Sequence, residues 1–311
     1  MAQFLVTGGC GFIGSHLADA LVGRGHRVRI LDNLSSGKRE NAPAAAELVV
    51  GDITDRAVVR ACTGDVDGIF HLAAVASVEQ SNGDWVGCHV VNLTGCINIF
   101  DAARRSAGPG VRVVYASSAA VYGDADAVPL QETTPPHPTH PYGADKLGCE
   151  LHGRVASRLY LVPTVGLRLF NVYGPRQDPC SPYSGVISIF AERLGRKAPL
   201  AIHGDGRQVR DFVAVADVVA FFIAAMEARE RAGTAYNVCT GIGTTVLELA
   251  ATMADRLGVT PVFEYAAARA GDIRSSIGDP GQAARQLGCT AKLSLRQGLG
   301  LLFADAAGKR G

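Results

Sequence analysis

QFLVTGGCGFIGSHLADAL, residues 3–21, carries Gly8, Gly11 and Gly14 between an apolar run and a helical stretch. Glycine permits a tight turn after a strand, a close approach of the backbone to a phosphate, and close packing of the next helix. A helix that starts at such a turn attracts anions, because its first backbone N–H groups are free. A glycine triplet alone also fits a structural turn. With its flanking strand and helix, it predicts a site for the pyrophosphate of a dinucleotide.

An acidic residue at the end of the second apolar run supports this interpretation. Asp32 ends HRVRILD, eighteen residues beyond Gly14. A carboxylate there can accept hydrogen bonds from both hydroxyls of the adenosine ribose, whereas the 2′-phosphate of NADP would meet a like charge. We therefore expect NAD, although Lys38 and Arg39 in the next loop leave a case for NADP. Asp52, in the turn after the third run, is expected either to contact adenine or to end a strand.

Short β-rich runs alternate with helical stretches through the first half of the 311-residue chain. The runs are QFLVTG, HRVRILD, ELVVGD, GIFHLAA and VRVVYASS. Such alternation predicts right-handed βαβ crossovers and a parallel sheet. A long helix is expected over residues 84–105, and another after the proline-rich loop 129–141. The expected fold class is therefore α/β, a Rossmann doubly wound parallel sheet.

The pattern loosens in the second half of the chain, where a smaller, interleaved C-terminal α/β domain is expected to bind the substrate. The expected NAD-binding Rossmann domain covers residues 1–168, and residues 210–237 return to it. The expected substrate domain covers residues 169–209 and 238–311.

Composition and charge exclude several functional classes. Thirty basic and 29 acidic side chains leave a net charge of +1, which offers no field to attract nucleic acid or a membrane surface. No apolar run approaches the roughly 18 residues of a membrane helix, and the first twenty residues lack a signal-peptide pattern. Eight scattered cysteines contain no Cys-x-x-Cys pair and are expected to be reduced structural thiols. We expect a cytoplasmic protein with a small ligand and without a nucleic-acid, membrane or metal partner.

Tyr142 and Lys146 lie four residues apart on the second predicted helix, so their side chains share one face. A tyrosine is a poor base at neutral pH, but an adjacent cation favours its phenolate form. Such a pair is also common on solvated helix faces. Here Ser117 and Ser118 end VRVVYASS at the edge of a parallel sheet where ligands bind. Either hydroxyl could relay a proton between a substrate hydroxyl and Tyr142, which would then act as base and acid.

Together these residues resemble the extended short-chain dehydrogenase/reductase family, in its sugar-nucleotide epimerase and dehydratase branch. The resemblance covers essentially the whole chain. It is carried by TGGCGFIGSHL, HLAA, VVNLTG, YASSAAVYG, HPYGADK, RLFNVYGPRQ, GDGRQVRDFV, YNVCTG and ARAGDIRSS. It implies that Ser118, Tyr142 and Lys146 are catalytic, and that Asn92 supports a water network at Lys146. The NAD-binding residues that it implies are Gly8, Gly11, Phe12, Ile13, Gly14, Asp32, Asn33, Ser36, Gly37, Asp52, Ile53, Leu72, Ala73, Ala74, Asn92, Ser117, Tyr142 and Lys146.

The residues after Ser118 favour one reaction within this branch. Dehydratases carry Asp-Glu where this chain has Ala119 and Ala120, and SSAAVYG is similar to the segment of the UDP-glucose 4-epimerases. The resemblance implies inversion of C4 in UDP-glucose and UDP-galactose, and in their N-acetylhexosamine forms, through a transient 4-keto sugar. A 4-ketosugar reductase and a UDP-uronic acid 4-epimerase are the alternatives. A non-catalytic NAD-binding sensor is disfavoured, because Ser118, Tyr142 and Lys146 are all present.

The resemblance also implies a set of residues that hold the nucleotide sugar. Asn171, Arg210 and Arg269 are expected at the diphosphate, Ala201 and His203 beside uracil, Val186 at a backbone contact, and Asp272 at a ribose. The full set is Ser118, Asn171, Val186, Ala201, His203, Arg210, Arg269, Asp272 and Ser276.

Four further features of the chain refine this expectation. Ser276 matches a gate position where a small residue accompanies acceptance of N-acetyl sugars, whereas Asp178 would repel a sugar acid. His140 stands where Ser is usual before Pro-Tyr, and Asp145 replaces a frequent Ser before Lys146. A homodimer through the long helices near residues 84 and 142 is expected from the family resemblance alone.

Overall fold

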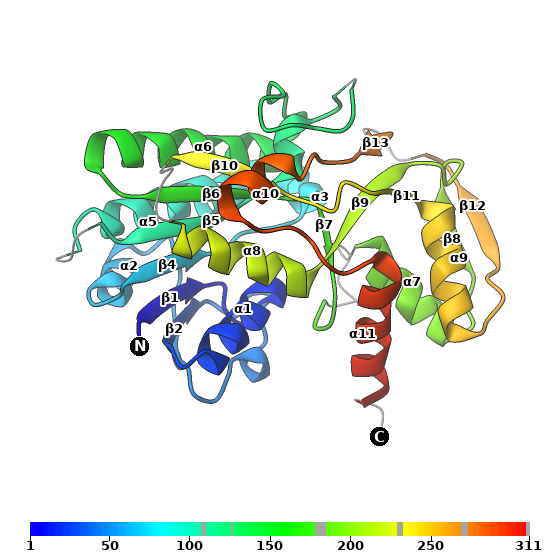
Figure 1. Cartoon of the computed structure of the whole chain (residues 1–311), viewed down its shortest axis with the longest axis horizontal. Coiled ribbons are helices and arrows are strands. Elements are labelled where there is room, and N and C mark those ends of the chain that lie inside the picture. The colour runs from blue at the N-terminus through cyan, green and yellow to red at the C-terminus, as the bar shows by residue number, and fades with distance from the viewer. Residues whose placement is uncertain (107–109, 126, 178–184, 229–232, 269–272, 309–311) are drawn as a thin grey trace.

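The computed structural model contains a seven-stranded parallel sheet with helices on both faces (Figure 1). The strand order is β10-β6-β5-β4-β1-β2-β3. The strands are β1 Gln3–Thr7, β2 Arg27–Asp32, β3 Glu47–Val50, β4 Gly68–His71, β5 Arg112–Ser118, β6 Thr164–Leu169 and β10 Thr234–Val238. The structure describes residues 1–106, 110–125, 127–177, 185–228, 233–268 and 273–308. This sheet confirms the predicted α/β fold class.

Each face of the sheet has its own hydrophobic core, because alternate side chains of a strand point to opposite faces. In β1, Val6 packs with the helices of one face and Leu5 with those of the other. The first face is covered by α1 Phe12–Gly23, α8 Val215–Glu227 and α10 Gly281–Leu287. The second face is covered by α2 Arg56–Thr63, α5 Gly95–Ala103 and α6 Pro141–Tyr160. Burial on both faces explains why the strands read as nearly continuous apolar runs.

The long helix predicted over residues 84–105 is present but is not uniform. After α3 Val78–Gly83, it consists of α4 Trp85–His89, a π-helical turn Val90–Thr94 and α5. The stretch Trp85–Ala103 is long and apolar enough to cross a membrane, yet half of it is buried inside the protein. Its inner side packs on the sheet and on α6, as the core helix of a globular domain does.

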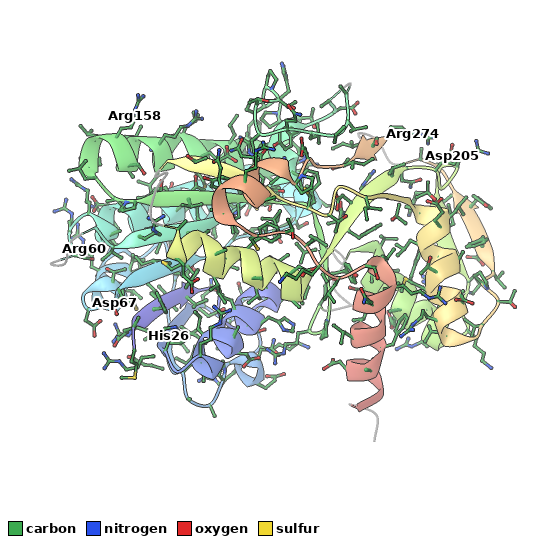
Figure 2. All side chains as sticks on the ribbon, in the orientation of Figure 1. His26, Arg60, Asp67, Arg158, Asp205 and Arg274 are labelled. Atoms are coloured by element: carbon green, nitrogen blue, oxygen red, sulfur yellow. The ribbon has the colours of Figure 1, made fainter. Side chains whose placement is uncertain are left out.

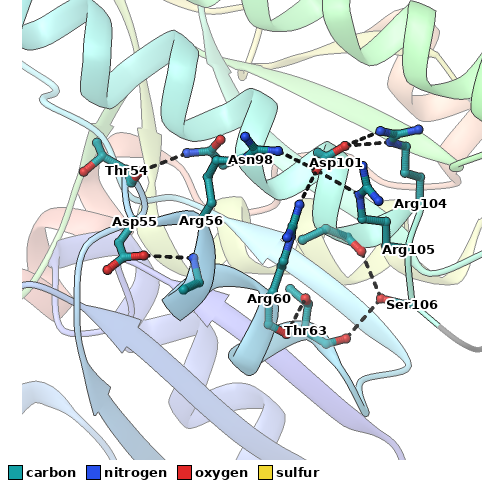
Figure 3. Close-up of polar contacts among 12 residues, drawn as sticks. Thr54, Asp55, Arg56, Arg60, Thr63, Asn98, Asp101, Arg104, Arg105 and Ser106 are labelled. Carbon is teal, nitrogen blue, oxygen red and sulfur yellow. Dashed lines mark hydrogen bonds and ion pairs between the residues drawn. The ribbon is translucent and has the colours of Figure 1, made fainter.

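One carboxylate joins the helices α2 and α5 at the surface (Figure 3). Asp101 on α5 accepts hydrogen bonds from Arg104 and Arg105, and it pairs with Arg56 and Arg60 of α2. Burial disfavours the charged form of Asp101, but these hydrogen bonds outweigh it and lower its pKa to about 2. The cluster fixes α2 against α5 on the side of the sheet that also carries α6.

A smaller part of the molecule follows β6 and lies to one side of the large sheet, on the right in Figure 1. Its main sheet is centred on β9 Val209–Ala214, which pairs with β7 Asn171–Tyr173, β11 Gly243–Thr245 and β13 Ser275–Ser276. A second sheet pairs β8 Leu200–His203 with β12 Phe263–Ala266. A third core lies under α7 Val186–Gly195, α9 Val246–Leu257 and α11 Leu295–Gly308.

The chain passes between the two parts several times, which fits an interleaved arrangement. Residues 210–214 belong to β9 and therefore to the smaller part. The return to the large sheet starts with α8 and continues with β10. The chain then leaves for α9 and comes back once more with α10, whose Ala283 lies in the core of the large sheet.

Candidate active site

A cavity of about 780 Å³ runs along the carboxyl ends of the parallel strands, where ligands bind in open α/β sheets. Most of the predicted cofactor residues line it. They are Gly8, Gly11, Phe12, Ile13, Gly14, Asp32, Asn33, Ser36, Gly37, Ile53, Leu72, Ala73, Ala74, Ser117, Tyr142 and Lys146. Asp52 and Asn92, which were also predicted, lie outside this lining.

The glycine turn forms a cradle that a side chain would fill. Gly8 has a φ of 69°, and a Cβ on it would lie 2.7 Å from the backbone nitrogen of Ala73. A Cβ on Gly14 would collide with the carbonyl oxygen of Gly8. Gly11 is the N-cap of α1 and caps it without a side chain, so the first N–H groups of the helix stay open to the cavity. This geometry fits a pyrophosphate group.

Asp32 is held rigidly at the end of β2. Its Oδ1 accepts a hydrogen bond from the backbone of Leu34 at 2.8 Å, and its Oδ2 accepts one from the backbone of Cys10 at 2.9 Å. The residue is only 7% exposed and lines the cavity. A carboxylate oxygen can accept more than one hydrogen bond. Both oxygens can therefore still accept bonds from a pair of ribose hydroxyls, which is the geometry expected for NAD.

Asp52 does not line the cavity but bonds to Asn33, which does. Its Oδ1 accepts hydrogen bonds from the backbone and side chain of Thr54, and its Oδ2 accepts one from Asn33 at 2.8 Å. Burial disfavours the charged carboxylate, but these hydrogen bonds outweigh it and lower the pKa of Asp52. The carboxylate thus orients Asn33, which does line the cavity.

Asn92, in the π-helical turn, holds the segment after β4. Its side-chain amide accepts a hydrogen bond from the backbone nitrogen of Val75 at 2.8 Å and donates one to the Val75 carbonyl at 3.1 Å. Val75 lines the cavity, whereas Asn92 is 1% exposed. The contacts of Asn92 therefore fix the shape of the cavity beside Lys146, from a position behind its wall.

Ser118, Tyr142 and Lys146 all line the cavity. Ser118 ends β5, and the other two lie one turn apart on α6. Lys146 is 5% exposed; its Nζ lies 5.7 Å from the centre of the Tyr142 ring and donates to the carbonyl of Ala116 at 2.9 Å. The ammonium is therefore held against both β5 and the phenol.

The two neighbouring serines have opposite hydrogen-bonding roles. Ser118 Oγ accepts a hydrogen bond from the backbone of Ala120 at 3.1 Å, so its own proton is available to a ligand. Ser117 Oγ instead donates to the buried carboxylate of Glu150 at 2.6 Å. Only Ser118 is thus prepared to donate a proton into the cavity.

A buried histidine lies near Lys146. His71 ends β4, and its Nδ1 shares a 2.7 Å hydrogen bond with Thr7 Oγ1. Burial, with a smaller contribution from the Lys146 ammonium, lowers the pKa of His71 to about 3. The imidazole is therefore neutral at physiological pH. His71 therefore adds no second positive charge beside the Lys146 ammonium.

A buried ion pair behind the serines was missed from the sequence. Arg168 of β6 donates two hydrogen bonds to Glu150 of α6, at 2.9 and 2.7 Å, and the two side chains are only 7% and 3% exposed. Arg168 also donates to Tyr122, which donates to Asn237 of β10 at 2.7 Å. The signal was available, because an arginine in the apolar run TVGLRL requires a buried partner.

The predicted substrate residues fall into three groups. Asn171 opens β7 and lines the cavity together with Ser118. Arg210 and Ser276 are register partners on β9 and β13. The remaining described residues lie farther along the smaller part: Val186 starts α7, and Ala201 and His203 lie on β8. Like Arg210 and Ser276, they are not among the residues that line the cavity. Arg269, Asp272 and the refining residue Asp178 lie outside the described residues.

Two polar contacts in and near the smaller part of the molecule were not predicted from the sequence. Gln177 lines the cavity and accepts a hydrogen bond from Ser188 of α7 at 2.7 Å. Arg274, which precedes β13, pairs with Asp205 at 2.8 Å on the far side of the smaller part, where Figure 2 shows them together. This pair ties the segment before Ser276 to the turn after β8.

Comparisons with known proteins agree with this geometry. Residues 4–239 match the model of the NAD dependent epimerase/dehydratase family. The chain is 39% identical over 303 residues to a UDP-glucose 4-epimerase of Mycolicibacterium smegmatis, covering 95% of each protein.

Solved structures give the same picture. The UDP-glucose 4-epimerase of Thermotoga maritima, determined with UDP-glucose, superposes with a TM-score of 0.94 at 37% identity, covering 99% of this chain and 100% of that one. The UDP-glucose 4-epimerase of Thermus thermophilus, in complex with NAD, gives 0.91 at 36% identity over 98% of this chain and 99% of that one. The match of the family model and the whole-length relatives confirm the predicted NAD-dependent class of enzyme. The chain belongs to the NAD dependent epimerase/dehydratase family.

Proposed function

We propose that the chain is a UDP-sugar 4-epimerase that interconverts UDP-glucose and UDP-galactose. The observation that carries the proposal is the joint placement of Ser118, Tyr142 and Lys146 in the same cavity as the glycine cradle and Asp32. Ala119 and Ala120 follow Ser118, so this segment supplies neither the acid nor the base that an elimination of water requires. Inversion needs one residue that removes and returns a proton.

The side chains of this chain divide the work of the reaction. Tyr142, which lies beside the Lys146 ammonium, removes the proton of the sugar 4-hydroxyl. Ser118 donates a hydrogen bond to the same oxygen and steadies the 4-keto sugar. Bound NAD would supply the hydride acceptor for C4, and the hydride would return to the opposite face of the same sugar carbon. Tyr142 then gives its proton back to the oxygen, so no proton or electron is gained or lost overall.

The size of one side chain in the smaller part of the protein bears on which sugars are accepted. Ser276 is 9% exposed, and its side chain is small, which favours room for an N-acetyl group. It lies in register with Arg210, the residue proposed for the diphosphate. We therefore include UDP-N-acetylhexosamines among the substrates. A UDP-uronic acid 4-epimerase and a 4-ketosugar reductase are the competing activities.

The decisive test is a product-resolved assay with the purified, NAD-loaded protein. UDP-glucose, UDP-N-acetylglucosamine and UDP-glucuronate are incubated separately, and the products are separated by chromatography. We expect C4 inversion of the first two sugars without added NADH. Tyr142→Phe should fold and lower kcat by about 10²–10⁴-fold. The exposed Tyr265→Phe is the matched control. Consumption of NADH in proportion to product would favour the reductase, and inversion confined to the uronic acid would favour the other epimerase.

We also propose a cytoplasmic homodimer. The cysteines that the structure describes are free thiols, as in a reducing compartment. Large apolar side chains are exposed on two neighbouring helices: Trp85, Val86 and Val90 on the long helix, and Leu151, Val155 and Leu159 on α6. Trp85 and Val86 are 65% and 75% exposed. A second copy of the same surface would cover them in a symmetric interface.

A further inference from the structure

The helix that carries Tyr142 and Lys146 begins at an unusual cap. His140 is the N-cap of α6, and its Nδ1 accepts a hydrogen bond from the backbone N–H of Gly143 at 3.1 Å. N-caps are commonly Ser, Thr, Asp or Asn, whose oxygens accept this bond at any physiological pH. An imidazole nitrogen can accept it only when that nitrogen carries no proton.

The cap acts directly on the catalytic geometry. Gly143 follows Tyr142 and is packed so tightly that a Cβ on it would lie 2.6 Å from the carbonyl oxygen of Ala120. The backbone N–H of Ala120 is the group that bonds to Ser118. The turn that His140 caps therefore packs against the short helix η3 Ala119–Tyr122, whose Ala120 N–H bonds to Ser118.

The imidazole also touches the catalytic phenol. The rings of His140 and Tyr142 are close to parallel, with an interplanar angle of 22° and 6.2 Å between their centres. The ring packs beside the phenol while Lys146 approaches it from the next turn of α6. The same side chain thus contacts the backbone of Gly143, directly after Tyr142, and lies beside the Tyr142 ring.

We propose that His140 is a positioning residue for Tyr142, and that the catalytic turn is correctly formed only while its Nδ1 is unprotonated. This inference rests on the proposed 4-epimerase function for its kinetic consequences. Protonation would turn Nδ1 into a donor facing the Gly143 N–H. It would also place a positive charge at the positive end of the helix dipole.

The surroundings of His140 agree with a neutral ring. Burial lowers the pKa of His140, against a smaller raising effect of a hydrogen bond to its own backbone. Tyr142 is the titratable group that faces the imidazole from α6. In the described part of the chain, neither η3 nor the loop before α6 places a charged side chain in hydrogen-bond or ion-pair contact with it. Because the folded-state pKa is depressed, the stabilisation by the cap is complete above the unfolded-state value of about 6.5 and is lost as pH falls through the folded-state value.

Two substitutions separate the two contributions. His140→Asn keeps a side-chain acceptor for the cap but removes the ring and the titration. His140→Phe keeps a flat ring beside Tyr142 but removes the cap. The kcat and KM of epimerisation are measured for the wild type and both variants between pH 5.5 and 9 (about 6.5 being the ordinary histidine pKa).

We expect His140→Phe to lower kcat at high pH about five-fold, the factor that matches the usual contribution of an N-cap, with KM for the nucleotide sugar unchanged. The kcat of the wild type should fall at low pH partly because His140 is protonated. His140→Asn lacks this titration, so its kcat should fall less steeply as pH is lowered. Wild-type kcat in His140→Phe, or an unaltered acid limb in His140→Asn, would overturn the proposal.

A second readout does not depend on activity. In protein with ¹⁵N-labelled histidine, the His140 signal is assigned by its absence from His140→Asn. We expect the tautomer with the proton on Nε2, and a titration midpoint below that of a free histidine. A proton on Nδ1 at neutral pH would refute the cap even in an active enzyme. Failure to invert any UDP-hexose would instead contradict the proposed function and leave this readout intact.

Discussion

At the scale of single residues, the two serines at the end of β5 differ in whether their hydroxyl proton can bond to a ligand. Ser117 and Ser118 are adjacent on β5, but Ser117 donates to the Glu150 carboxylate, while Ser118 accepts from the Ala120 N–H. The sequence identified both serines at the correct edge of the sheet. From the residues alone either serine could relay the proton, and only the family resemblance implied Ser118. The difference in hydrogen bonding depends on Glu150 and Ala120, which are brought near by the fold.

This difference predicts opposite effects of two otherwise similar substitutions. Ser118→Ala should lower kcat by about 10²-fold or more while leaving the free energy of unfolding within about 0.5 kcal/mol of the wild type. Ser117→Ala should keep most of kcat but lower the free energy of unfolding by about 1.5–3 kcal/mol, because a hydrogen bond to a buried charge is lost. Steady-state kinetics and urea unfolding of both variants measure the two effects. The assignment fails if Ser117→Ala is the variant that loses turnover.

At the scale of elements, α6 is held at its first turn and at its middle. His140 fixes its first turn, and Glu150 ties its middle to Arg168 of β6. The spacing of Tyr142, Lys146 and Glu150, each four residues apart, places all three on that face. The helix and its start were predictable, because a proline-rich loop precedes Pro141. The partner of Glu150 was not, since it lies on a strand eighteen residues away in sequence.

The buried pair predicts a large cost of removing one charge. Glu150→Gln should lower the free energy of unfolding by about 3–5 kcal/mol, because Arg168 is left buried without a counter-charge. Asp255→Asn breaks the exposed pair with Arg296 and serves as the control, which should change stability little. Urea unfolding monitored by circular dichroism compares the two variants. A Glu150→Gln variant with the unfolding midpoint of the wild type would show that the pair does not stabilise α6.

At the scale of the whole molecule, the sequence predicted the large sheet but not how the smaller part is assembled. Alternating apolar runs specify local strands, and parallel crossovers order them along the chain. The smaller sheet instead pairs β9 with β7, β11 and β13, which come from widely separated segments. The register of Ser276 with Arg210 depends on these long-range pairings. Local periodicity carries no information about such pairings.

The exposed apolar surface on α6 and the long helix predicts the assembly state. In size-exclusion chromatography with light-scattering detection, the wild type should have twice the molar mass of one chain. Val155→Glu introduces a charge into this surface and should give a monomer. Val262→Glu, at another exposed valine away from this surface, should stay dimeric. A monomeric wild type, or a dimer that survives Val155→Glu and Leu151→Glu together, would place the interface elsewhere.

The central claim is that the hydride of C4 is stored within the protein and returned to the same carbon. UDP-glucose carrying deuterium at C4 tests it most directly, with the product analysed by mass spectrometry and NMR. We expect UDP-galactose that retains the deuterium at C4, with no NADH released. Deuterium lost to water, or NADH formed in proportion to product, would contradict it.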